Sequence, residues 1–247
     1  MMTSTGGTKA IIGISGGKDS SVTAALMARV VGADNVYGIL MPDGHQPDIS
    51  YAYEIAEHLK IHHTKIDISY ITSSFYRQLH ESAFTKEFPI SEQTQINLPP
   101  RVRMTLLYAV SQSIEGSRVI NTGNLSEDWI GYATVYGDTA GAFAPFGMLT
   151  CDEVIALGRE MGIPEKFLVK PPADGLRKRT DEEVFGYSYK TLNQYIRLGI
   201  APDPVSKKKI DNSHLRSRFK YRPLPAFDPR LPVIAHLETG DQRVEEV

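Results

Sequence analysis

The sequence has one cysteine, Cys151, one tryptophan and no long apolar run among its 247 residues. One cysteine cannot form a disulfide within the chain or a cysteine-rich metal site. No window approaches the roughly 18 apolar residues of a membrane-spanning helix. The polar start, MMTSTGGTK, does not resemble a signal peptide. These absences predict a cytoplasmic protein with no membrane partner.

The chain also lacks an excess of charge of one sign. It has 27 basic and 29 acidic residues, which give a formal net charge of −2. No overall positive field exists to attract nucleic acid, so we expect no nucleic-acid partner. A local positive site for a phosphorylated small molecule remains compatible with this balance. The length is sufficient for one α/β domain with a full core.

Short apolar runs alternate with segments of helical periodicity. This alternation predicts an α/β fold with a doubly wound, mostly parallel five-stranded sheet and helices on both faces. Four of the strands can be placed in the sequence, at 10–14, 36–41, 63–68 and 117–123. Helices are predicted at 20–31, 50–59, 98–114, 151–161 and 189–198. Ligands of such sheets bind beyond the carboxyl ends of the strands.

Long segments without a clear period are predicted to be irregular: 81–97, 132–149, 170–187 and 201–232. Loops this long are uncommon in a compact domain and often close over a ligand. The last one carries KKK at 207–209 and RSRFKYR at 216–222. A substrate clamp and a surface loop both remain open for it. We therefore divide the chain into a main domain, 1–200, and a basic, proline-rich C-terminal segment, 201–247.

The stretch IIGISGGKDS (11–20) ends an apolar run in two glycines, followed by charged and hydroxyl side chains. The glycine pair lets the backbone turn tightly, and Gly17 can adopt a positive φ without a penalty because it has no Cβ. Successive backbone N–H groups can then form a concave anion site at the start of the next helix. Asp19 would be repelled by a bare phosphate, so we expect a magnesium ligand or a helix N-terminal charge there. The stretch matches neither the Walker nor the G-x-G-x-x-G pattern.

SGGKDS resembles the SGGxDS loop of the ATP pyrophosphatases in the adenine-nucleotide α-hydrolase-like superfamily, which cleave ATP between the α- and β-phosphates. Four further stretches resemble the NAD synthetase family within it: LPPRVRMTLLYAV (98–110), VINTGNLSEDWIGYATVYGD (119–138), LGREMGIPEKFLVKPPADGL (157–176) and TDEEVFGYSY (180–189). The resemblance covers roughly residues 8–200. With no room for a glutaminase domain, the chain is similar to the ammonia-dependent form, which is usually a homodimer.

The resemblance implies ATP-dependent amide formation through an adenylate. The carboxylate of deamido-NAD would attack the α-phosphate of ATP and release pyrophosphate. Ammonia would then displace AMP to give NAD. The resemblance implies ATP as co-substrate and Mg²⁺ as cofactor.

The resemblance also assigns residues to this reaction. The ATP-binding residues would be Ser15, Gly16, Gly17, Lys18, Asp19, Ser20, Ser21, Thr122, Lys170 and Ser188. Asp19 and Glu127 would hold the metal. Asp138 would hold or deprotonate ammonium, and Lys170 would reach the α-phosphate or the departing pyrophosphate. The acceptor-binding positions would be Arg101, Val135, Ala142, Phe219 and Lys220.

Three acceptor positions depart from the family pattern. The family usually has lysine where Val135 stands, aspartate where Ala142 stands and histidine where Phe219 stands. Loss of a charged partner from a polar substrate site weakens binding of the matching ligand group. Two acceptors therefore remain open: deamido-NAD, or another carboxylic acid such as nicotinate mononucleotide or a specialised metabolite.

Two other classes of protein are less favoured. A tRNA-thiolating enzyme would share the phosphate loop, but such enzymes usually need catalytic cysteines and Cys151 stands alone. A non-catalytic nucleotide sensor would be expected to have lost a metal carboxylate or Lys170, and the sequence keeps both.

Overall fold

The computed structural model describes residues 1–169 and 181–227. Within these ranges a parallel sheet is formed by β1 (Lys9–Gly13), β2 (Val36–Leu40), β3 (His62–Lys65) and β4 (Ser117–Val119). The strand order is β3-β2-β1-β4. The chain adds β2 and β3 on one side of β1 and then returns to add β4 on the other side of β1. The predicted doubly wound parallel architecture is confirmed, and the reversal of order lies between β1 and β4.

The predicted number of five strands is wrong, since the described residues form four. The chain beyond β4 meets a returning segment at an isolated parallel bridge between Ile120 and Phe143. The Ala142 N–H also donates to the Val119 carbonyl at 2.8 Å. Pro145 follows two residues after the bridge and has no N–H to donate, so the pairing does not extend into a strand.

Helices occupy most of the remaining described chain. They are α1 (Lys18–Val31), α2 (Ile49–His58), α3 (Ser69–Glu81), α4 (Ala83–Glu87), α5 (Glu92–Gln112), α6 (Leu125–Ile130), α7 (Cys151–Glu160), α8 (Glu165–Leu168), α9 (Asp181–Phe185), α10 (Tyr189–Leu198) and α11 (Pro204–Ser217). Short 3₁₀ turns are η1 (Thr3–Thr5), η2 (Ala33–Asn35) and η3 (Arg218–Tyr221). None of the helices in the described ranges combines the length and apolar character of a membrane span.

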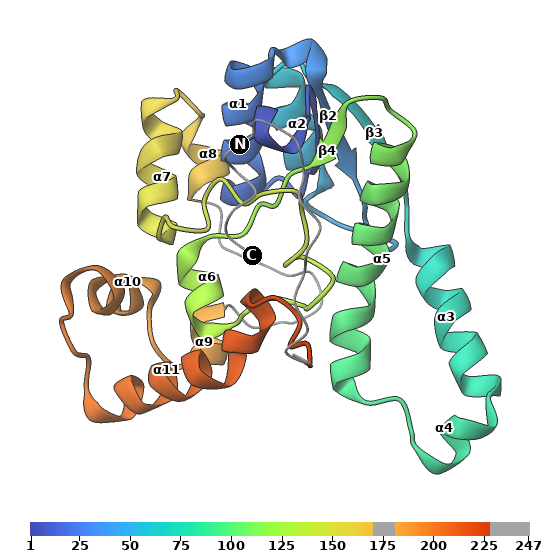
Figure 1. Ribbon diagram of the computed structural model, residues 1–247, viewed down its shortest axis with the longest axis vertical. Coiled ribbons are helices and arrows are strands. Elements are labelled where there is room, and N and C mark those ends of the chain that lie inside the picture. The colour runs from blue at the N-terminus through green and yellow to red at the C-terminus, as the bar shows by residue number, and fades with distance from the viewer. Residues whose placement is uncertain (170–180, 228–247) are drawn as a thin grey trace, which may run out of the picture.

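The alternation of side chains along β1 builds a three-layer core. Ala10 and Ile12 face a cluster that includes α1, α2, α7 and α8, whereas Ile11 faces a second cluster with α5. All three side chains are fully buried. Because successive strand residues point to opposite faces, this short apolar run supports helices on both sides of the sheet (Figure 1).

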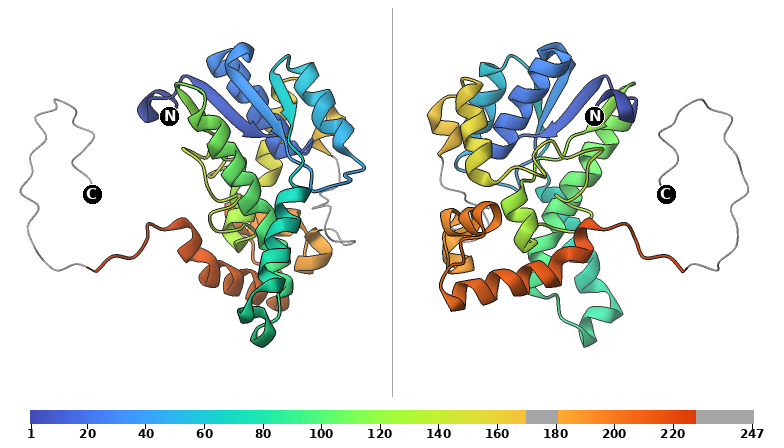
Figure 2. Two further views of the ribbon diagram at one scale, coloured as in Figure 1. Left: turned by 90° about the vertical axis from the view of Figure 1, so that its right-hand side faces the viewer. Right: turned by 60° about the vertical axis from the view of Figure 1, so that its left-hand side comes forward.

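The C-terminal part of α5 packs on the sheet, whereas α3, α4 and the N-terminal part of α5 extend beyond it as an arm (Figures 1 and 2). Segment 81–97 was predicted to be irregular, but it contains α4 and the first residues of α5. The Ser91 hydroxyl accepts the Thr94 N–H at 3.1 Å and caps α5, which therefore begins earlier than predicted. Segment 170–187 likewise contains α9.

Beyond the carboxyl edge of the sheet, α6, α7, α10 and α11 pack around a third cluster with Leu192 and Ile210 at its centre. The prediction of irregular structure over 201–232 was wrong for α11. The Asp203 carboxylate accepts the Val205 and Ser206 N–H groups, and Pro204 stands in the first turn. The division at residue 200 stays a prediction.

Candidate functional site

Residues 15–21, which we call the glycine loop, comprise the turn after β1 and the first residues of α1, and they require glycine at one position. Gly16 has a φ of +79°, and a Cβ there would lie 2.7 Å from the Ala52 nitrogen of α2. Gly17, which the sequence allowed to adopt a positive φ, instead has an extended φ of −90°. The left-handed residue and the close helix approach together explain the glycine at 16.

The polar groups of the glycine loop bond mainly to one another. The Ser20 and Ser21 hydroxyls both donate to the Gly17 carbonyl, at 3.2 and 2.7 Å. The Ser15 hydroxyl accepts the Gly17 N–H at 3.3 Å and lies 3.1 Å from the Ser20 hydroxyl. These bonds fix a compact turn, and α1 begins immediately after it at Lys18.

Asn124 joins the glycine loop to α6, although it was not among the predicted site residues. Its amide donates to Asp19 Oδ1 at 3.0 Å, and its carbonyl oxygen accepts the Ser126 and Glu127 N–H groups at 3.0 and 3.2 Å. The residue is fully buried and is the N-cap of α6. An asparagine directly before a helical segment is an N-cap signal that could have identified it.

Lys18 brings its charge between the two carboxylates predicted to hold metal. Its Nζ lies 2.8 Å from Asp19 Oδ2 and 3.8 Å from Glu127 Oε1. Burial lowers the pKa of Lys18, but Asp19 and Glu127 outweigh this effect and raise it above the ordinary value. Loss of water and the nearby Asp19 raise the pKa of Glu127, and Lys18 opposes that shift. The two carboxylates thus share one cation.

Carboxylate oxygens from two different loops fit Mg²⁺, which often takes one or two protein carboxylates and completes its shell with water and substrate phosphates. Asp19 and Glu127 have the required donor type and a common neighbour, Lys18. Within residues 1–169 and 181–227 no third histidine, cysteine or acid joins them in a metal cluster. The donor set therefore fits a metal that is bound together with a nucleotide.

Residues 131–141, which we call the YGD loop, carry Asp138. The Thr134 N–H donates to Asp138 Oδ1 at 2.5 Å, and the Asn121 amide donates to the carbonyls of Asp138 and Ala140 at 2.7 and 3.0 Å. Tyr136 has a φ of +61°, which is unfavourable for a residue with a side chain. The surrounding contacts must hold the loop in this conformation.

Asp138 is exposed as a residue, but its carboxyl accepts the Thr134 N–H and loses part of its water to the protein groups around it. Partial loss of water raises the pKa of its carboxyl, while the Thr134 N–H, Lys220 and Arg103 oppose the rise. Arg103 itself is tied down, because its Nε donates to the Met41 carbonyl at the end of β2 at 2.9 Å. The sequence did not single out Arg103 as a site residue.

The predicted acceptor positions gather around the YGD loop, apart from Phe219. The Arg101 Nε donates to the Val135 carbonyl at 3.1 Å, and the Lys220 Nζ donates to two carbonyls of the same loop. Ala142 lies just after the loop, beside β4. Phe219 is 67% exposed on η3.

Three predicted ATP-binding residues lie outside the contacts described so far. Thr122 is half-buried between β4 and α6. The Ser188 hydroxyl accepts the Thr191 N–H at 3.2 Å and so caps α10. Lys170 lies outside the described residues.

Cys151 is buried at the start of α7, where its N–H donates to the Ser126 hydroxyl at 2.9 Å. Burial raises the pKa of its thiol to about 12, although Lys18 opposes the shift. A thiol that stays protonated is a poor nucleophile, which disfavours sulfur-transfer chemistry at this residue.

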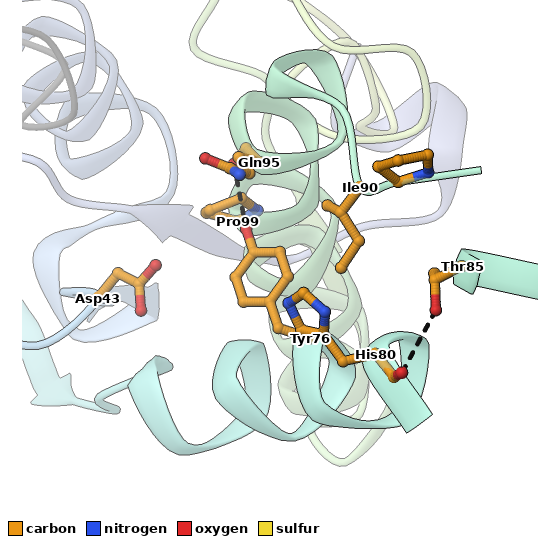
Figure 3. A pocket seen from close by; sticks show the side chains of 8 residues that line it. Asp43, Tyr76, His80, Thr85, Ile90, Gln95 and Pro99 are labelled. Carbon is orange, nitrogen blue, oxygen red and sulfur yellow. Dashed lines mark hydrogen bonds between the residues drawn. The ribbon is translucent and has the colours of Figure 1, made fainter. Parts of the chain in front are cut away.

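A pocket of about 600 Å³ lies on the arm formed by α3, α4 and α5 (Figure 3). Its lining residues are Asp43, Tyr76, His80, Thr85, Pro89, Ile90, Gln95 and Pro99. None of these is a predicted site residue. Pro99 of the lining is followed by Pro100, whose Cβ would lie 3.0 Å from a Cβ added to Gly137, so the pocket adjoins the side of the site that carries the YGD loop.

Comparison with known proteins identifies the family. A family model described as NAD synthase matches residues 1–222. An NH₃-dependent NAD(+) synthetase from Archaeoglobus fulgidus is 34% identical over 227 residues, which cover 89% of this chain and 88% of the relative. One from Methanocaldococcus jannaschii is 35% identical over 204 residues, with coverages of 80% and 77%.

Solved structures agree with this similarity. The structure of an NMN synthetase from Francisella tularensis matches with a TM-score of 0.79 and 28% identity, over 91% of this chain and 90% of that chain. An NH₃-dependent NAD synthetase from Campylobacter jejuni matches with a TM-score of 0.71 and 28% identity, over 90% of each chain. The resemblance noted in the sequence is confirmed, and the chain belongs to the NAD synthase family.

Proposed function

We propose that the protein is an amide ligase that converts deamido-NAD to NAD with ATP and ammonia and releases AMP and pyrophosphate. The observation that carries this proposal is that the Asp19 and Glu127 carboxylates both lie beside Lys18 Nζ, at 2.8 and 3.8 Å. Asn124 joins the Asp19 carboxylate to the backbone N–H of Glu127. Family membership adds the reaction class, since curated relatives at about a third identity are NH₃-dependent NAD synthetases.

In the first half of the reaction the substrate carboxylate attacks the α-phosphorus of ATP, and the bond to the bridging oxygen breaks to release pyrophosphate. The glycine loop and the start of α1 would bind the phosphates through N–H groups, and through the Ser20 and Ser21 hydroxyls once these turn away from the Gly17 carbonyl. Asp19 and Glu127 would hold Mg²⁺, which neutralises charge on the polyphosphate when bound. Lys18 lies beside both carboxylates and would add positive charge there.

Other residues would complete the nucleotide site. Thr122 would hydrogen-bond ATP from the end of β4. Ser188 can still donate its hydroxyl proton to a phosphate while it accepts the Thr191 N–H. Lys170, outside the described residues, would reach the α-phosphate or the departing pyrophosphate.

In the second half ammonia attacks the acyl carbon of the adenylate, and AMP leaves. Ammonium must lose a proton before its nitrogen is nucleophilic, so a carboxylate that gathers ammonium beside the adenylate would assist. Asp138 would serve this purpose, because it is accessible to solvent and is oriented by the Thr134 N–H. Arg101 at the same loop would bind a phosphate or carboxylate of the acceptor.

A second acceptor, nicotinate mononucleotide, is favoured by two observations. Val135 and Ala142 replace charged residues that the family usually carries on the acceptor side. The chain also resembles an NMN synthetase with a TM-score of 0.79, against 0.71 for the Campylobacter NAD synthetase. The curated relatives favour deamido-NAD as the main acceptor.

The assay that tests the proposal supplies purified protein with ATP, Mg²⁺, ammonium and either deamido-NAD or nicotinate mononucleotide. We expect NAD, AMP and pyrophosphate in equal amounts from deamido-NAD. Faster pyrophosphate release with nicotinate mononucleotide would favour the second acceptor, and no release with either would refute the ligase. Omission of Mg²⁺ tests the metal, and light scattering tests the proposed homodimer. A cytoplasmic location stays a prediction.

A further inference from the structure

The end of the described chain packs tightly on α6 and on the residues that leave it. A Cβ on Gly131, at the end of α6, would lie 2.0 Å from the Ser217 Cβ of α11, so the two backbones are in close contact. The His214 ring stacks on Trp129 of α6 with centroids 4.1 Å apart, and its Nδ1 lies 2.9 Å from the Trp129 carbonyl oxygen. Figure 2 shows α11, drawn in orange, passing beside α6.

Lys220 extends this contact into the YGD loop. Its Nζ donates to the Gly131 carbonyl at 2.8 Å and to the Ala133 carbonyl at 2.6 Å. An ammonium group has three protons to donate, and the lysine thereby commits two of them to the backbone. The carbonyls lie 89 and 87 residues away in the sequence, so these bonds connect the C-terminal segment to the loop.

The segment held by Lys220 leads directly to Asp138. Thr134 follows Ala133, and its N–H is the donor to Asp138 Oδ1 at 2.5 Å. The Thr134 hydroxyl in turn donates to Asn97 of α5 at 2.7 Å. A shift of the carbonyl at Ala133 would move the peptide group whose N–H orients the carboxylate.

The YGD loop has no helix or strand of its own to resist such a shift. Tyr136 keeps its left-handed φ because outside contacts hold the loop. Asn121 holds the carboxyl end of the loop and Arg101 its middle, whereas Lys220 holds the amino end next to α6. Each of the three contacts therefore secures a different part.

We infer that Lys220 is a positioning residue, which holds the amino end of the YGD loop so that Asp138 is correctly placed for ammonium. This inference rests on the proposed function of Asp138. It differs from the prediction that Lys220 binds the acceptor, because two of its three protons bond to loop carbonyls. Lys220 thus acts on the transfer of nitrogen, and the adenylation step depends on the glycine loop.

The test separates the two half-reactions in Lys220→Met, Lys220→Arg and the control Lys208→Met, which removes an exposed lysine of α11. Adenylation is measured as deamido-NAD-dependent ATP–pyrophosphate exchange, and transfer as NAD formation against ammonium concentration. For Lys220→Met we expect the KM for ammonium to rise about 10-fold or more, with exchange within about 2-fold of the wild type. Lys220→Arg should restore most of the ammonium affinity, and Lys208→Met should match the wild type.

Two kinetic outcomes would overturn the inference. A higher KM for deamido-NAD with an unchanged KM for ammonium would make Lys220 an acceptor ligand. An equal fall in the rates of ATP–pyrophosphate exchange and of NAD formation would mean that Lys220 has only a general structural role. If the wild type forms no NAD, the proposed function fails by itself. Hydrogen exchange then decides, because the amides of 131–141 should exchange faster in Lys220→Met than in Lys208→Met, and equal rates would refute the positioning contact.

Discussion

The glycine loop and the YGD loop lie at the same edge of the sheet but are held in different ways. In the glycine loop the hydroxyls of Ser15, Ser20 and Ser21 bond within the loop, and buried Asn124 makes one tie to α6. The YGD loop depends on side chains from α5, from the residues after β4 and from η3, whose bonds span 34, 17 and 89 residues of sequence. We therefore expect changes in the first loop to abolish chemistry and changes around the second to alter substrate use.

The largest effect is expected from Asp19→Asn. Asparagine keeps the shape and can accept the Asn124 amide, but it removes one of the two carboxylates beside Lys18. Loss of a metal ligand on the polyphosphate should reduce pyrophosphate release by about 1000-fold. Circular dichroism should show an intact fold. Asp34→Asn, an exposed acid of η2, is the matched control, and an unchanged turnover in Asp19→Asn would refute the metal role.

Asp138→Asn should separate the two loops. Asparagine can still accept the Thr134 N–H, so the loop should keep its conformation. NAD formation should fall by about 100-fold, the range for loss of a proton-transferring group. ATP–pyrophosphate exchange should stay near the wild-type rate. A parallel loss of both activities would place Asp138 in the adenylation step.

The pH dependence of transfer gives a second test of Asp138. Burial among protein atoms raises the pKa of its carboxyl, so the acid stays protonated to a higher pH than an ordinary aspartate. Only the carboxylate can hold ammonium, and transfer should be lost as pH falls through this raised pKa. Measurement at constant free ammonia removes the titration of the substrate, and Asp138→Asn should lack this acid limb.

The two loops also differ in how much of them the sequence could predict. The glycine loop is formed by neighbouring residues after a strand, so its position, its hydroxyls and Asp19 could be inferred, although the left-handed glycine is Gly16 and not Gly17. Lys220 and Arg101 contact the YGD loop across long sequence separations, which no local pattern encodes. Long-range contacts limit the prediction of the fold as well. The central strands were predicted, but the bridge at Phe143 stands in place of a fifth strand and depends on tertiary contacts.

A smaller effect is expected when the missing charges are restored beside the YGD loop. Val135→Lys with Ala142→Asp returns the residue types that the family usually carries at these positions. The Val135 carbonyl would still accept the Arg101 Nε, because the substitution changes the side chain alone. If deamido-NAD is the acceptor, its KM should fall by about 3- to 10-fold through regained polar contacts. An unchanged KM in the double variant, with both single variants as controls, would argue for a different acceptor.

The smallest effect concerns stability, at Asp128 of α6, the helix that connects the two loops. Burial raises the pKa of Asp128 to about 6, and its hydrogen bond from Tyr221 opposes the shift. The folded protein therefore prefers the neutral acid, and ionisation costs stability at pH values above about 6. This cost fades as pH falls toward the ordinary pKa of 3.8, because the unfolded chain then takes up the proton as well.

Asp128→Asn removes that cost and keeps an acceptor for Tyr221 of η3. We expect the free energy of unfolding in urea to rise by about 1 kcal/mol at pH 8, with the value reduced for partial solvent screening. At pH 4.5 the gain should be smaller. A loss of stability at pH 8 would instead mean that the charged carboxylate strengthens the bond to Tyr221 by more than its burial costs. The contact between η3 and α6 would then stabilise the protein through a hydrogen bond to a charged carboxylate, on the helix that leads into the YGD loop.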